Sequence, residues 1–357
     1  MQQNSFLLYG ANGYTGELIA RYAAQYNLQP VLAGRNETAL RALATRLQLP
    51  YKVISLDDTA ALVQALKAVK FVIHAAGPFH LTAQPMVEAC IQAGTHYLDI
   101  NGDITVFEML QQYDQAAKDA GIMVLPGAGF DVVPTDCIAV LLKTLLPDAS
   151  DLKLAFATSG GGVSHGTAMS MAYKLGEGGA VRRAGKIVRT SLGHHGRWID
   201  FGPKKLFTMS IPWGDVATAY FSTGIPNITA YTGIPLNVYR LLKLQRLFNW
   251  LLRTSFVRNI IKKKIGQRPS GPTDEMRSKA YSLVWGQVYN TAGRKATVTL
   301  KSPDGYTLTM YSCLLMAQKI CNGEWKVGYQ TPGTAYGAEF VMEIPGVERD
   351  IIIANHR

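Results

Sequence analysis

The sequence predicts an α/β fold: a doubly wound parallel sheet followed by a second, α+β domain. In the first half of the chain, six short apolar runs alternate with segments whose apolar residues recur at helical spacing. After Pro134 this alternation stops. Strands that alternate with helices are typical of a parallel sheet, and a glycine-rich turn after the first strand is typical of its Rossmann-type form.

We expect three segments along the chain. They are a Rossmann domain at 1–130, an α+β substrate or cover domain at 131–333, and a carboxyl-terminal segment at 334–357 that returns to the Rossmann domain. A chain of 357 residues is long enough for two domains. Apolar residues make up 48% of the chain and charged residues 17%, which is typical of a folded protein and not of a disordered one.

The net charge of +11 and the pI near 9.4 favour anionic partners: a phosphorylated cofactor, an acyl carrier, an anionic lipid surface or nucleic acid. The four cysteines lack metal-site and redox spacing, so we expect no metal site and four buried thiols in a reducing compartment. No secretory leader and no apolar run of ~18 residues is recognisable. We therefore expect a cytoplasmic protein, with a peripheral membrane contact as a further option.

The glycine-rich turn after the first strand, 5–9, is the leading cofactor motif. Gly10 permits a sharp turn, Gly13 keeps side chains away from the phosphates, and Gly16 lets the following helix pack close to the strand. The helix N-terminus then binds a pyrophosphate through backbone N–H groups. A plain strand-to-helix connection is the alternative, because the spacing is G-x-x-G-x-x-G. We expect cofactor contacts from Gly10, Ala11, Asn12, Gly13, Tyr14, Thr15 and Gly16.

The end of the second strand, 30–35, indicates which dinucleotide binds. An acidic residue there would bind the ribose 2′-hydroxyl of NAD, whereas Arg35, after Gly34, can bind a 2′-phosphate. The sequence therefore favours NADPH, with a solvated Arg35 as the alternative. Asp57 follows the third strand, 51–56, where it is expected either to contact the adenine or, like Asp58, to cap a helix.

The fourth strand, 71–76, is a continuous apolar run, as expected for a strand covered on both faces. Small residues at its end let the ribose and nicotinamide pass close to the backbone. We expect strands at 96–100 and 122–126, with one long helix at 104–120 between them, to complete the sheet. The cofactor contacts expected at the end of the fourth strand are Ala76, Gly77, Pro78 and Phe79.

Further motifs extend along nearly the whole chain. They are Ala33-Gly34-Arg35, Gly77-Pro78-Phe79, Tyr97 to Gly102, Gly127 to Asp136, Gly160 to Ser170, Gly271 to Glu275, Leu283 to Gly286, Ser302 to Tyr306 and Thr331 to Ala335. Together with the glycine-rich turn, they resemble the saccharopine dehydrogenase-like oxidoreductases, most closely their trans-acting enoyl reductase branch. The resemblance implies an NADPH-dependent enzyme that reduces a C=C (enoyl) bond in a lipid or polyketide-type acyl substrate, free or carrier-bound.

Two alternatives stay open. Saccharopine-type chemistry would act on a C=N bond of an amino-acid adduct, for which Arg182, Arg183 and Arg189 are available as carboxylate ligands. A non-catalytic NADPH-binding protein at a lipid surface is the other alternative.

Three residues are candidate catalytic groups. The resemblance implies that Asp131 lies near the nicotinamide, whereas helix capping by Asp131, Thr135 or Asp136 is the alternative. His165 and Thr167 lie in a Gly/Ser/Thr loop, 159–167, before an expected helix at 168–175. A histidine with a pKa near neutrality can donate a proton to a developing enolate, and a structural loop histidine is the alternative.

The segment 235–268 interleaves apolar and basic residues, and no acidic residue lies between Asp215 and Asp274. This pattern suits an anionic membrane surface, an acyl-carrier protein or a lipid-like substrate, with a cover helix that has a solvated basic face as the alternative. No nucleic-acid recognition motif accompanies it, so we expect no nucleic-acid partner. An oligomer is compatible with the sequence.

The remaining segments predict a second sheet. We expect strands at 152–157, 295–301, 306–315 and 325–329, and a helix at 334–342 that returns to the first domain.

Overall fold

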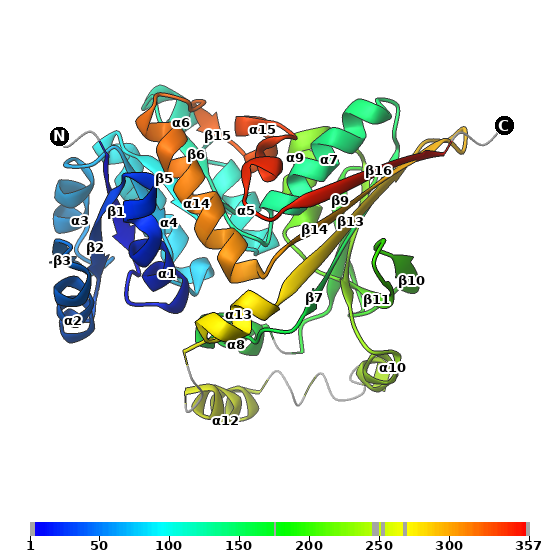
Figure 1. Ribbon diagram of the computed structural model, residues 1–357, viewed down its shortest axis with the longest axis horizontal. Coiled ribbons are helices and arrows are strands. Elements are labelled where there is room, and N and C mark those ends of the chain that lie inside the picture. Colours follow the sequence, from blue (N-terminus) through cyan, green and yellow to red (C-terminus); the bar gives the residue numbers. More distant parts are fainter. Residues whose placement is uncertain (1–3, 175, 245–249, 251–253, 267–269, 355–357) are drawn as a thin grey trace. The chain divides into compact units, whose positions relative to one another are not determined.

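The computed structural model describes residues 4–174, 176–244, 250, 254–266 and 270–354 (Figure 1). The chain forms two compact units. The first contains Met1–Val133 and Tyr306–Tyr336, and the second contains Pro134–Gly305 and Gly337–Arg357. This division differs from the expected segments 1–130, 131–333 and 334–357, because the chain returns to the first unit at 306 and leaves it again after 336.

The first unit is built on a seven-stranded sheet in the order β15-β6-β5-β4-β1-β2-β3. Every pair of neighbouring strands is parallel, which confirms the predicted doubly wound sheet. The strands are β1 (Ser5–Tyr9), β2 (Gln29–Gly34), β3 (Tyr51–Val53), β4 (Phe71–His74), β5 (His96–Asp99), β6 (Met123–Leu125) and β15 (Gly328–Tyr329).

Helices connect these strands as the apolar spacing predicts. Asn36 and Asp58 cap α2 and α3 through their side chains, so Asp58 and not Asp57 is the cap of that pair. The expected long helix 104–120 is two helices, α5 and α6. The helices are α1 (Tyr14–Tyr22), α2 (Glu37–Leu47), α3 (Thr59–Leu66), α4 (Phe79–Ala93), α5 (Ile104–Gln111), α6 (Asp114–Asp119), α14 (Gly305–Cys321) and α15 (Pro332–Tyr336).

The strand expected at 306–315 is wrong, because this segment lies inside the helix α14. Its apolar residues alternate over 306–310 and so imitate a strand, but the buried residues of the whole segment recur three and four apart. The strand expected at 325–329 is only Gly328–Tyr329, and it extends the first sheet beside β6 instead of joining the second.

Helix α14 holds the loop that follows β6. Thr309 accepts a hydrogen bond from the Phe130 N–H through its hydroxyl oxygen at 2.9 Å. The Ser312 hydroxyl donates to the Ala128 carbonyl at 2.6 Å, and both side chains are buried. The first unit therefore needs a helix that is encoded more than a hundred residues after β6.

The second unit contains a nine-stranded sheet with the main order β10-β11-β12-β7-β13-β14-β16, while β8 pairs with β12 and β9. Strands β12 and β7 are parallel, and the other pairs are antiparallel. The strands are β7 (Asp151–Ser159), β8 (Gly179–Arg183), β9 (Lys186–Thr190), β10 (Gly196–Asp200), β11 (Lys205–Ile211), β12 (Asn227–Gly233), β13 (Tyr281–Tyr289), β14 (Lys295–Pro303) and β16 (Glu348–Ala354).

The carboxyl-terminal segment does not return to the first unit as a whole. Only α15 lies there, and β16 pairs with β14 in the second sheet. The described helices of the second unit are α7 (Val133–Leu145), α8 (His165–Tyr173), α9 (Asp215–Thr223), α10 (Leu236–Leu244), α12 (Ser255–Gly266), α13 (Asp274–Lys279) and the 3₁₀ turn η3 (Phe340–Glu343).

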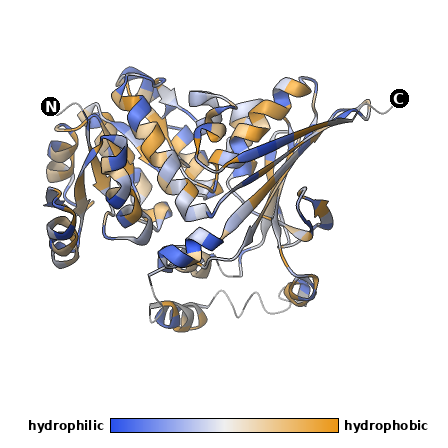
Figure 2. Cartoon of the chain, viewed as in Figure 1, coloured by the Kyte–Doolittle hydropathy of each residue, from blue (hydrophilic) through white to orange (hydrophobic). Residues whose placement is uncertain are grey.

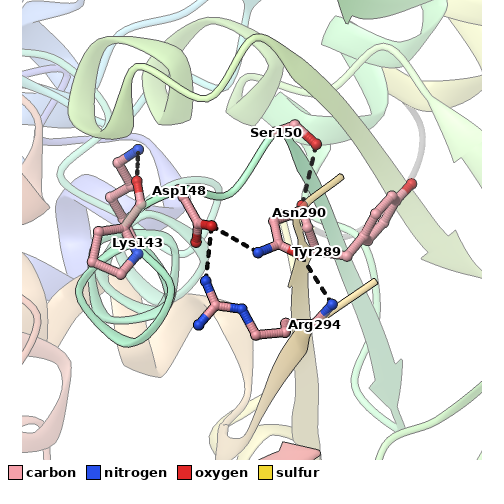
Figure 3. Close-up of polar contacts among 7 residues, drawn as sticks. Lys143, Asp148, Ser150, Tyr289, Asn290 and Arg294 are labelled. Atoms are coloured by element: carbon pink, nitrogen blue, oxygen red, sulfur yellow. Dashed lines mark hydrogen bonds and ion pairs between the residues drawn. The ribbon is translucent and has the colours of Figure 1, made fainter. Parts of the chain in front are cut away.

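A polar cluster fastens the β13–β14 hairpin to the loop between α7 and β7 (Figure 3). One carboxylate oxygen of Asp148 accepts hydrogen bonds from the Asn290 amide and the Arg294 guanidinium, each at 2.8 Å. The Ser150 N–H donates to the Tyr289 carbonyl at 3.0 Å. The hydrogen bond from Asn290, followed by Arg294, lowers the pKa of Asp148.

Replacing Thr309 with Val should test the role of α14 in the first unit. Valine keeps the shape but removes the acceptor, which leaves the buried Phe130 N–H without this bond. We expect the free energy of unfolding to fall by ~1–3 kcal/mol in urea titrations. Thr38→Val on the exposed side of α2 is the control, and its effect should stay within ~0.5 kcal/mol. Equal losses in the two variants would contradict the predicted role.

Candidate cofactor site

The glycine-rich turn lies between β1 and α1, with its backbone pressed against the end of β4. Gly10 has φ +85°, and a Cβ atom there would lie 2.7 Å from the Ala76 nitrogen. The Gly10 N–H donates to the Ala33 carbonyl of β2 at 2.8 Å. A side chain at position 10 would therefore be strained and would also push two strand ends apart.

The start of α1 approaches the same turn. A Cβ atom on Gly16 would lie 2.3 Å from the Gly10 carbonyl oxygen, a contact that only glycine permits. Gly13 is the N-cap residue of α1, and no side chain caps the helix there. A helix N-terminus without a side-chain cap presents backbone N–H groups and a partial positive charge, which suit a diphosphate. The turn fits a dinucleotide cofactor.

The end of β2 carries the residues expected to select the cofactor. Arg35 and Asp57 are both exposed, and both act electrostatically on the Tyr9 hydroxyl, which donates to the Ile54 carbonyl at 3.0 Å. Burial raises the pKa of Tyr9, while Arg35 lowers it and Asp57 raises it. The Asn12 side chain approaches Gly34 closely, since a Cβ on that glycine would lie 3.3 Å from its amide oxygen.

The loop after β4 is held by Thr82 of α4. The Thr82 hydroxyl donates to the Ala76 carbonyl at 2.8 Å, and its oxygen lies 3.0 Å from Nε2 of His74. Burial lowers the pKa of His74 to about 3, so the imidazole is neutral. The Phe79 ring packs edge-on against it at 5.3 Å.

Asp99 organises the ends of β5 and β6. Its fully buried carboxylate accepts hydrogen bonds from the Tyr97 hydroxyl at 2.6 Å, the Asn101 side chain at 2.7 Å and the Gly127 N–H at 2.9 Å. Burial raises the pKa of Asp99, and the hydrogen bond from Tyr97 is the strongest opposing influence. One carboxylate thus fixes the loops that follow two neighbouring strands.

Asp131 lies against the same pair of loops. A Cβ on Gly102 would lie 2.4 Å from the Asp131 carboxylate oxygen, so a side chain at 102 would displace the Asp131 side chain. Tyr14 at the start of α1 packs edge-on against Tyr306 in the first turn of α14, with ring centroids 4.9 Å apart. The expected cofactor residues and Asp131 therefore all lie in the first unit, near the carboxyl ends of its strands.

The other two candidate catalytic residues lie in the second unit. His165 is the first residue of α8 and is exposed, and its N–H donates to the Ser270 carbonyl at 2.9 Å. The Thr167 hydroxyl lies 3.1 Å from that of Ser164, the N-cap residue of α8. The helix begins at His165 and not at the expected Ala168, and the catalytic roles of His165, Thr167 and Asp131 stay predictions.

Thr135 and Asp136 are not caps, because both lie inside α7, buried against α9. The Thr135 hydroxyl donates to the Asp215 carboxylate at 2.6 Å, and Asp136 accepts from the Ser222 hydroxyl. Cys90, Cys137 and Cys313 are buried as expected, whereas Cys321 is only partly buried.

The sequence reasoning gave no role to His74 or Asp99. Each is a polar residue at the carboxyl end of a buried strand, which is the cofactor edge of a parallel sheet. That position is the signal that could have identified them. Thr309 and Ser312 had no usable signal, because their segment was assigned to a strand.

The glycine constraint can be tested by Gly10→Ala with Gly94→Ala as its matched control. Both glycines have positive φ, +85° and +68°, but nothing lies within 4 Å of a Cβ on Gly94. Backbone strain of ~1–2 kcal/mol should be common to both variants. We expect only Gly10→Ala to lose NADPH affinity, by more than ~10-fold in calorimetry, because it also displaces the turn. Unchanged NADPH affinity of Gly10→Ala would refute the prediction that the glycine-rich turn binds the cofactor.

The role of Arg35 can be tested by Arg35→Asp, with Lys67→Asp as the control. Both side chains are exposed, and Lys67 precedes β4 at the other end of the strands. Loss of a charge-assisted contact to the 2′-phosphate should weaken NADPH binding ~10–100-fold, whereas NADH binding should be kept or strengthened, because an acidic residue at this position can bind the ribose 2′-hydroxyl. Lys67→Asp should change neither affinity. Equal weakening of both cofactors by Arg35→Asp would contradict recognition of the 2′-phosphate.

Comparison with known proteins agrees with this geometry. Residues 6–125 match the family model for the saccharopine dehydrogenase NADP binding domain. The human saccharopine dehydrogenase-like oxidoreductase is 24% identical over 202 residues, which are 50% of this chain and 47% of that protein. The trans-acting enoyl reductase of Mycobacterium ulcerans is 31% identical over 138 residues, 36% of this chain and 33% of that protein. The matches thus span half or less of these relatives.

The fold extends this similarity to both units. Apo saccharopine dehydrogenase (L-Glu forming) from Saccharomyces cerevisiae superimposes with a TM-score of 0.63, covering 98% of this chain and 100% of that chain. The sequence identity is 12%, so this likeness concerns the fold alone. Residues 6–125 therefore form an NADP-binding domain of the saccharopine dehydrogenase type, and about half of the chain is similar in sequence to saccharopine dehydrogenase-like oxidoreductases.

Proposed function

We propose that the chain reduces a C=C (enoyl) bond in a lipid or polyketide-type acyl substrate, with NADPH as the reductant. The observation that carries the proposal is the glycine-rich turn beside Arg35 within a region that matches an NADP-binding domain. The 31% identity to a trans-acting enoyl reductase supports the enoyl class over other reductions. The substrate is a small acyl molecule, free or bound to a carrier.

Bound NADPH supplies a hydride, which in this class goes to the β-carbon of a conjugated thioester. The protein then has to stabilise charge on the thioester oxygen and bring a proton to the α-carbon. Asp131, His165 and Thr167 are the proposed groups for these tasks. His165 is the strongest candidate for the proton, because its side chain is exposed and histidine is the side chain that most often acts as a general acid.

Reduction of a C=N bond is the second candidate, supported by the names of several relatives. Such a substrate carries carboxylates and would need arginines free to bind them. The Arg182 guanidinium instead donates to the carbonyls of Val216 and Gly185 at 2.7 and 2.8 Å and stacks over Tyr220. Its structural role weakens this candidate, whereas Arg183 and Arg189 remain exposed.

A non-catalytic NADPH-binding protein at a lipid surface is the remaining candidate. Among the described residues, no helix has the length and apolar character needed to cross a bilayer. Any membrane contact by this part of the chain would therefore be peripheral. We propose that the protein is located in the cytoplasm.

The proposal predicts NADPH oxidation with enoyl thioesters. Anaerobic mixtures of protein, NADPH and a panel of enoyl thioesters should lose NADPH absorbance, and mass spectrometry should find the saturated thioester. A panel of imines formed from amino acids and aldehydes tests the second candidate. His165→Gln should lower kcat by ~10²-fold while NADPH affinity is retained.

The controls separate catalysis from binding. Gly10→Ala should abolish turnover, whereas Gly94→Ala should retain it. Turnover of imines alone would replace the enoyl assignment. NADPH binding without turnover of either panel would favour the non-catalytic candidate.

A further inference from the structure

Large apolar side chains are exposed on α10, on α12 and between them. Trp250 and Phe256 are 71% and 73% exposed, and Leu241 is 67% exposed. Val238 and Ile260 are 38% and 43% exposed, each about one helical turn from Leu241 or Phe256. Exposing apolar surface to water costs ~25 cal/mol per Å². A group of large exposed apolar side chains is therefore typical of a surface that binds a partner or a membrane.

These side chains are not needed to fasten the helices to the second unit. Tyr239 of α10 already packs against Phe207 at 5.0 Å and donates its hydroxyl proton to the Gly193 carbonyl at 3.2 Å. Ile265 of α12 is buried, and α12 packs along α8. Each helix therefore has one apolar side that is packed and another that faces solvent.

The charged residues in this part of the sequence all have one sign. From 216 to 273 the sequence contains arginines and lysines but no aspartate or glutamate. Arg240, Lys243, Lys263 and Lys264 are exposed on α10 and α12. Figure 2 shows hydrophilic and apolar residues interleaved along both helices. Other apolar and basic residues of the segment 235–268 lie outside the described residues. They are Arg246, Leu247, Leu251, Arg253 and Arg268.

We propose that this surface docks on an anionic phospholipid bilayer. It consists of Val238, Leu241, Trp250, Phe256 and Ile260 with the four exposed cations, and we call it the basic apolar surface. Helices of nine and twelve residues are too short to span a membrane but can lie in its interface. The apolar side chains then enter the headgroup region while the cations remain at the lipid phosphates.

A lipid surface fits these residues better than an acidic carrier protein. A carrier would satisfy the cations but would leave large apolar side chains on two helices and the segment between them without a common partner. A bilayer accepts apolar side chains wherever they lie along its surface. This inference stands independently of the proposed function, because it uses neither the cofactor site nor a substrate.

Vesicle flotation of the full chain tests the inference. The probes are phosphatidylcholine vesicles with and without about 30% phosphatidylserine, at ~0.1 M and ~0.5 M salt. We expect the protein to float with the anionic vesicles at low salt and to be largely released at high salt. Purified acyl carrier protein and light scattering test the two other occupants, a carrier and a second copy of this chain.

Two pairs of variants separate the charged and apolar contributions. The double variant Lys263→Glu with Lys264→Glu should lower partitioning to anionic vesicles at least ~10-fold. Its control is Lys186→Glu with Lys205→Glu, which changes the net charge equally at two exposed lysines outside the basic apolar surface. The control should leave partitioning unchanged. Trp250→Ser with Phe256→Ser should lower it at least ~10-fold. Trp198→Ser with Ile352→Ser, 54% and 56% exposed, is the apolar control.

Unchanged NADPH affinity and an unchanged thermal unfolding temperature would show that the variants fold. Binding that is equal for neutral and anionic vesicles, or equal losses in a test pair and its control, would overturn the inference. Binding of the carrier protein without vesicle binding would overturn it as well. The inference would also be overturned if the chain forms a dimer in solution and the double variant Trp250→Ser with Phe256→Ser dissociates that dimer.

Discussion

The cofactor site depends on one steric constraint, the approach of backbone to backbone at Gly10. A side chain there would meet the start of the loop after β4, and one at Gly16 would meet the Gly10 carbonyl. The ends of β1, β2 and β4 and the start of α1 are therefore drawn together where Gly10 and Gly16 have no side chains. The N–H groups of α1 and the cation at Arg35 then border the same edge of the sheet. A diphosphate and a 2′-phosphate need these two features together.

The rest of that edge is ordered by buried polar groups. Asp99 joins the loops after β5 and β6, and the Thr309 and Ser312 hydroxyls of α14 bind the backbone of the second loop. These bonds compensate for burying a carboxylate and main-chain groups away from water. The matched NADP-binding region ends at residue 125, yet the loop after β6 and α14 complete the unit. The cofactor domain is thus discontinuous in sequence.

The alternation of apolar strands and helices was enough to predict the parallel sheet, and glycine spacing was enough to place the turn. Both are local features whose cause lies within a few residues. Helix α14 was missed because alternating Tyr306, Leu308 and Met310 imitate a strand, whereas the helical spacing of its buried residues extends over the longer segment 305–321. The location of β16 depends on its pairing with β14 across some fifty residues, which no local pattern encodes. Catalytic residues are harder still, because the chemistry depends on a substrate.

Hydrogen exchange measured with and without NADPH reports on the glycine-rich turn itself, and so on whether the cofactor binds there. We expect slower exchange of the amides at 10–17 and 34–36 when NADPH is added, and unchanged exchange in β13 and β14 of the second sheet. Protection should be weaker with NADH, most of all at 34–36. Unchanged exchange at 10–17 under saturating NADPH, or protection confined to the second unit, would contradict the proposed seat.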